Sequence, residues 1–133
     1  MGISKYVAAP EMKEKVLKIA QTMGVEYSHL VERINEIGFL RATSDSDFWA
    51  AVSIIPPKYR LFTDITYVIT FNPRFFNSPE VFQDKIIEHE LLHIPPSFDF
   101  VEQHDTEDFQ VCLLKWGLTW ADPECKEKIL PKE

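Results

Sequence analysis

The sequence is poor in cysteine and glycine and contains no long hydrophobic run. Of its 133 residues, 2 are cysteine and 4 are glycine, which excludes a disulfide scaffold and a collagen-like chain. Two cysteines without an evident secretory leader are more often reduced thiols than a bridge, so we expect no disulfide and a cytoplasmic location. No apolar stretch approaches the roughly 20 residues that cross a bilayer. We therefore expect no membrane partner.

Positive charge is also scarce. The chain carries 14 Lys and Arg against 21 Asp and Glu, a formal net charge of -7, and the basic residues form no cluster. An acidic protein repels phosphate groups. We therefore expect no nucleic-acid partner.

What remains is the composition of a soluble globular protein. Hydrophobic residues make up 45% and charged residues 26% of the chain, close to the averages of folded domains. A chain of this length fits one domain, residues 1–133, with enough residues to bury a core. Residues 122–133, around Pro123, read as a loose C-terminal tail.

Hydrophobic periodicity predicts helices and strands in a mixed order. Helical spacing and terminal signals indicate helices over 10–23, from about Leu30 to Gly38, over 79–93 and over 106–116. Alternation predicts strands over 39–43 and 65–71, whereas residues 48–55 fit either a strand or a helix. Ser78 is the predicted N-cap of the third helix, and Pro95 ends that helix. This order predicts an α+β fold in which helices cover a short mixed or antiparallel sheet.

The sequence HELLH, residues 89–93, is the clearest chemical signal. On a helix, His89 and His93 project from the same face one turn apart, so that both imidazoles can bind one zinc ion. Glu90 can then take a proton from a water that the metal activates and pass it to a leaving amine. A structural alternative without a metal is also open. Phe82 and Ile86 share this stripe of the helix, so both histidines could be hydrogen-bonded core residues.

A catalytic zinc site needs a third protein ligand. His104 is the better histidine candidate, since it follows the proline break by a loop that can fold back over the metal, whereas His29 lies among residues that look structural. Carboxylates also bind zinc, and one of them could instead accept the free N–H of a ligand histidine. The carboxylate alternatives are Asp99, Glu102, Asp105, Glu107 and Asp108.

The motif and its flanks resemble known metallopeptidases. HELLH after a strand resembles the zincins, and residues 39–116 are similar to a family of phage and archaeal-virus metallopeptidases through YVITFNPRFF, IIEHELLHIP and HDTEDF. The resemblance implies a zincin-like catalytic core at about 39–120, zinc ligands His89, His93 and His104, and Glu90 as the base. For a viral protein it also implies a host cytoplasm. Asp99 stands where metzincins carry a third histidine, which argues against that subgroup.

The sequence therefore supports two functions of different classes, beside the possibility that the motif is incidental. The leading hypothesis is a zinc-dependent peptidase that binds an extended peptide or protein substrate beside a sheet edge. The alternative is a zinc-binding regulatory or interaction domain that cuts nothing.

Overall fold

The computed structural model describes residues 5–44 and 49–102. Helices and strands are mixed along the chain, consistent with the predicted α+β fold. In chain order they are β1 (Tyr6–Ala8), α1 (Met12–Thr22), the 3-10 helix η1 (Val25–Tyr27), α2 (Ser28–Glu32), the 3-10 helix η2 (Ile34–Glu36), β2 (Ile37–Ala42), β3 (Ala50–Ile54), the 3-10 helix η3 (Pro57–Leu61), β4 (Tyr67–Phe71), α3 (Pro73–Phe76) and α4 (Glu80–Leu91).

The strands form one mixed sheet in the order β1-β2-β4-β3. The central pair, β2 and β4, is parallel, while β1 and β3 pair antiparallel with their neighbours. The predicted small mixed sheet is thus confirmed, and residues 50–54 of the ambiguous segment are a strand. Among the described residues, β3 forms one edge of the sheet.

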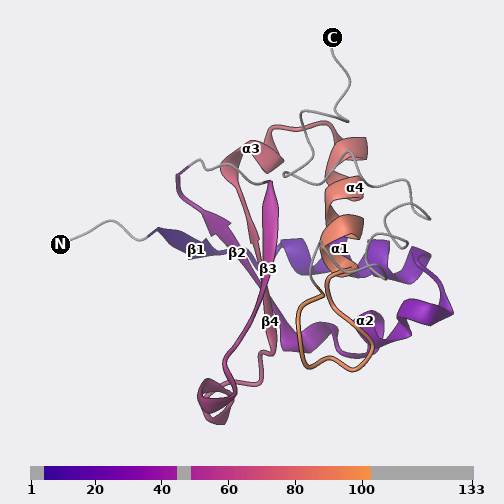
Figure 1. Cartoon of the computed structure of the whole chain (residues 1–133). Helices are drawn as coiled ribbons and strands as arrows, with labels where there is room; N and C mark the ends of the chain where they lie inside the picture. Colours follow the sequence, from indigo (N-terminus) through magenta and orange to yellow (C-terminus); the bar gives the residue numbers. More distant parts are fainter. Residues whose placement is uncertain (1–4, 45–48, 103–133) are drawn as a thin grey trace.

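Helices gather on one face of this sheet (Figure 1). Along β4, every second residue is buried, which is the alternation expected when one face of a sheet packs on a core. Ion pairs of Lys15 with Glu80 and with Asp84 join α1 to α4. The largest fully buried side chains are Tyr67, Phe71, Phe75, Leu30, Ile69, Ile86, Ile87, Leu91 and Ile94.

The first predicted helix is confirmed, and its end has a simple cause. Helix α1 ends at Thr22, and Gly24 follows with a φ of 97°. Side chains other than hydrogen are disfavoured at such a positive φ. Glycine therefore lets the chain turn away from the helix axis.

The second predicted helix is wrong beyond Glu32. Helix α2 stops there, η2 follows, and Ile37 and Gly38 belong to β2 rather than to a helix end. The apolar residues whose spacing suggested a helix through Gly38 are divided among three elements, α2, η2 and β2. A short-range pattern cannot show that Ile37 pairs with Tyr67.

The predicted cap of α4 is also wrong. The hydroxyl of Ser78 donates to the carbonyl of Arg74, 2.9 Å away, so it closes α3 instead of capping α4. Helix α3 and strand β1 are additions to the sequence prediction. The strand predicted over 65–71 begins at Tyr67, because the N–H of Ile65 donates to the side chain of Thr63 in a turn.

Several predictions lie outside the described residues. These are the helix over 106–116, the tail over 122–133, the C-terminal part of the core expected over 39–120, and the state of both cysteines, Cys112 and Cys125. Within residues 5–44 and 49–102, no helix has the length and apolar character needed to cross a membrane.

Candidate metal centre

The HELLH residues lie at the C-terminal end of α4. The regular helix ends at Leu91, two residues before the predicted end, and His93 follows in a tighter turn in which its N–H donates to the carbonyl of Glu90. Such turns with a three-residue spacing are common where helices end. His93 nevertheless stays on the side of α4 that carries His89.

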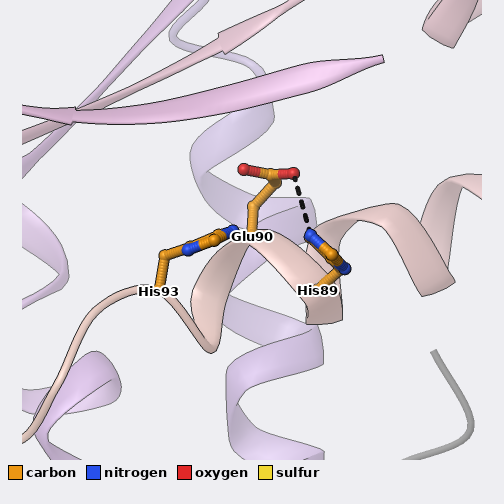
Figure 2. A group of neighbouring side chains, drawn as sticks. All are labelled: His89, Glu90 and His93. Carbon is orange, nitrogen blue, oxygen red and sulfur yellow. Dashed lines mark ion pairs between the residues drawn. The ribbon is translucent and has the colours of Figure 1, made fainter. Parts of the chain in front are cut away.

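His89, Glu90 and His93 form one cluster (Figure 2). One ligand atom from each lies within 4.8 Å of the other two. The two imidazole rings are 5.1 Å apart between centroids and inclined by 66°, and Nε2 of His89 lies 3.9 Å from Oε2 of Glu90. The three side chains therefore share one focus rather than pointing apart.

All three side chains are buried. The exposed fraction is 0% for His89, 3% for Glu90 and 6% for His93. Burying a carboxylate beside two imidazoles is costly unless the groups are hydrogen-bonded or bind a metal. This burial favours a site that binds an ion over a chance arrangement of surface residues.

The orientation of the His93 ring is set by the backbone nine residues later. Its Nδ1 lies 2.5 Å from the carbonyl oxygen of Glu102, and the N–H of Glu102 donates to the carbonyl of His93 at 2.8 Å. Because a carbonyl only accepts, Nδ1 must carry the proton, which leaves the lone pair on Nε2. Ligand histidines in metal sites are typically held in this way.

The donor set therefore fits a divalent metal ion. Two imidazole nitrogens and a nearby carboxylate suit zinc and other first-row transition metals. One imidazole already has the tautomer that a metal requires. From the sequence, a carboxylate is a possible partner of a ligand histidine, but in the structure the partner of His93 is a main-chain carbonyl, which no residue-type pattern could reveal.

Most candidates for the third ligand lie outside the residues that the structure describes. His104, Asp105, Glu107 and Asp108 lie outside the described residues, so the prediction for His104 is not tested. Asp99 accepts a hydrogen bond from Ser97 at 2.6 Å, and neither Asp99 nor the Glu102 carboxylate belongs to the cluster found among the described residues.

His29 is placed as the sequence analysis expected, away from the metal cluster. Its Nε2 lies 2.9 Å from the carbonyl oxygen of Ile94, and its exposed fraction is 9%. Since a carbonyl accepts, Nε2 of His29 is the donor.

Two aromatic side chains contact α4 or the segment that follows it. The hydroxyl of Tyr67 donates to the carbonyl of Phe100 at 2.6 Å, and burial raises the pKa of Tyr67 to about 12. The ring of Trp49 packs edge-on against Phe82 at 4.8 Å. Trp49 thus packs against α4.

Comparison with known proteins gives one match. The model of a family described as "Putative phage metallopeptidase" matches residues 4–127. No curated protein and no solved structure matches the chain.

Proposed function

From the premise that this chain belongs to the phage metallopeptidase family, we propose that it is a zinc-dependent peptidase with His89 and His93 as metal ligands and Glu90 as the general base. The observation that carries this proposal is the buried cluster of the three side chains, with Nε2 of His93 left as the acceptor. The Nδ1–H of that ring donates to the carbonyl of Glu102. Nε2 is therefore the ring nitrogen whose lone pair would bind the metal.

In the proposed reaction, the metal ion and Glu90 have different roles. When bound, zinc supplies Lewis-acid activation of a water molecule and of the scissile carbonyl. Glu90, whose carboxylate lies between the histidines in Figure 2, accepts the proton of the attacking water at an Oε atom and returns it to the leaving amine. Because the Glu90 carboxylate is buried, few other water molecules compete for it, and its hydrogen bond to the attacking water is stronger.

We assign the third ligand to His104. The double hydrogen bond between His93 and Glu102 brings the backbone at residue 102 beside the metal ligands. His104 follows two residues later in the sequence. This short reach supports His104 over the more distant Glu107 and Asp108.

The edge strand β3 supplies a place for an extended peptide. The carbonyl of Trp49 and the N–H of Ile55 hydrogen-bond toward β4. By the alternation of an antiparallel ladder, the N–H and C=O groups of Ala50, Val52 and Ile54 point away from the sheet. Since α4 packs against β3 (Figure 1), a peptide paired to this edge would lie beside the metal cluster.

The expected substrate is thus a peptide or an extended protein segment, recognised largely through its backbone. A net charge of -7 supports a protein substrate rather than a nucleic acid. Membership in a phage family and the low cysteine content support action in a host cytoplasm.

Replacement of Glu90 by Gln tests the catalytic role. The Glu90→Gln variant should retain zinc, because the histidines are unchanged, and should lose cleavage of a permissive peptide library by at least about 100-fold, the usual contribution of a general base. Zinc content by elemental analysis and cleavage by mass spectrometry are measured on the same preparations.

Glu88→Gln is the matched control. Glu88 lies two residues away on the same helix and lines the groove between α1 and α4, so the same chemical change should leave cleavage intact. Equal cleavage by the wild type and Glu90→Gln would remove Glu90 from the mechanism. A wild type that binds zinc and cleaves nothing would favour the non-catalytic binding domain.

A further inference from the structure

We propose that His29 and Tyr67 are positioning residues for the metal centre: they anchor the segment Ile94–Glu102, whose last carbonyl orients His93. The relevance to zinc rests on the proposed function. The positioning itself is a property of the chain alone. Each acts through the backbone of this segment, by a hydrogen bond to one of its carbonyls.

Residues 94–102 form a loop that starts directly after His93. Its last residue, Glu102, hydrogen-bonds back to His93. The loop leaves α4 after His93 and returns so that Glu102 makes two hydrogen bonds with that residue, one to the backbone and one to the ring. The loop contains no helix or strand. Beyond a backbone bond from Phe98 to Pro95 and a side-chain bond from Ser97 to Asp99, side chains from the rest of the molecule hold its conformation.

Two such side chains anchor the loop near its two ends. His29 of α2 donates from Nε2 to the carbonyl of Ile94 at 2.9 Å, and Tyr67 of β4 donates from its hydroxyl to the carbonyl of Phe100 at 2.6 Å. Both donors are buried, with exposed fractions of 9% and 0%. A buried donor that loses its acceptor is penalised, so each bond holds the loop in place.

Phe98 links the two anchors. Its side chain is 3% exposed, and its ring packs edge-on against Tyr67 at 4.7 Å and against His29 at 6.4 Å. The guanidinium of Arg33 lies 4.0 Å from the centroid of the same ring. Phe98 also has a φ of 60°, which bulky residues rarely adopt. The packing of the ring therefore compensates for an unfavourable backbone conformation.

These contacts place the Glu102 carbonyl against Nδ1 of His93. If the loop relaxes, that hydrogen bond weakens and the proton of His93 can occupy either ring nitrogen. A ring with its proton on Nε2 cannot bind a metal through that atom. Loss of such orienting partners commonly weakens metal binding by about 10-fold to 100-fold.

The test uses two substitutions in the full chain, each of which removes one hydrogen-bond donor to the loop. Tyr67→Phe removes only the hydroxyl that bonds Phe100, and His29→Leu removes the donor to Ile94. Each should weaken zinc binding by about 10-fold, measured by competition with a chromophoric chelator. His29→Gln restores a donor amide and should recover most of the affinity, a rescue that loss of packing alone would not predict.

Matched variants and a metal-free readout complete the test. Tyr59→Phe makes the same chemical change at a tyrosine that is 51% exposed and should not alter binding. Nitrogen-detected NMR of the metal-free protein should show His93 protonated at Nδ1 in the wild type and a mixture of tautomers in Tyr67→Phe and His29→Leu.

The possible failures are distinct. An unchanged His93 tautomer in both variants, or a His29→Gln protein as impaired as His29→Leu, would overturn the positioning role. A wild type that holds the Nδ1 tautomer and loses it in the variants supports that role even if it cleaves no peptide, and in that case only the proposed peptidase function fails.

Discussion

At the scale of single residues, His93 is held in place by two hydrogen bonds to one residue, Glu102. Its backbone carbonyl and its ring both bond to Glu102, and its exposed fraction is 6%. Fixing the ring before a metal arrives reduces the entropy lost on binding. The proposed site is therefore preorganised on the side of His93, and the proposal assigns its third ligand to His104.

His104→Ala tests that ligand. Removing the third of three protein ligands should lower zinc affinity by at least about 100-fold, since catalytic zinc sites depend on three. Asp105→Asn is the control, because it removes the neighbouring carboxylate and keeps His104. Both affinities come from chelator competition. Unchanged stoichiometry and affinity in His104→Ala would place the third ligand elsewhere.

At the scale of elements, the junction between α2 and β2 shows how tertiary contacts end a helix. The guanidinium of Arg33 makes two bonds of 2.8 Å to the carboxylate of Glu36. Thr66 adds a backbone bond to the Glu36 carbonyl and a hydroxyl bond to its carboxylate. Glu36 thus ties η2 to Thr66, the residue just before β4. The chain leaves the helical path at this point.

Glu36→Gln should change the acid dependence of stability. The hydrogen bonds from Arg33, with a further one from Thr66, hold the pKa of Glu36 below its ordinary value of 4.5. A lowered carboxyl pKa stabilises the fold above the unfolded value, and this contribution is lost as the pH falls through the folded value. Because Arg33 is 41% exposed, we expect at most about 1 kcal/mol at neutral pH.

Urea denaturation across pH measures this effect. The difference in free energy of unfolding between wild type and Glu36→Gln should be present at neutral pH and should shrink at pH values below 4.5. A difference that stays constant through the acid range would show that the carboxylate charge does not stabilise this junction.

At the scale of the whole molecule, the apolar side chains differ widely in burial. Many fill the core between the sheet and the helices, where Phe75 is 0% exposed. Others are exposed, such as Leu61 and Phe62 in the connection between β3 and β4, at 86% and 85%. The buried side chains stabilise the isolated chain, because burial is the source of the hydrophobic contribution.

Phe75→Ala and Phe62→Ala form a matched pair for this distinction. Loss of the buried ring should lower the free energy of unfolding by about 3–5 kcal/mol, whereas the exposed substitution should stay within about 0.5 kcal/mol. Chemical denaturation of both variants checks the prediction. Similar losses would mean that Phe62 is buried in the folded protein in solution.

Much of the fold was readable from short-range patterns. The spacing of Val16, Ile19 and Ala20 predicted α1, and the alternation through Tyr67, Ile69 and Phe71 predicted the buried face of β4. The motif spacing predicted that His89, Glu90 and His93 lie together, as they do. Their roles as ligands and base stay predictions.

Local sequence determined these features because helix and strand repeats depend on neighbours within a few residues. The end of α2, the acceptor of Ser78 and the loop that orients His93 were decided by the tertiary structure. His29 and Ile94, for example, are 65 positions apart. A donor has no fixed acceptor until folding brings a distant carbonyl within about 3 Å, because hydrogen bonds act only at that range.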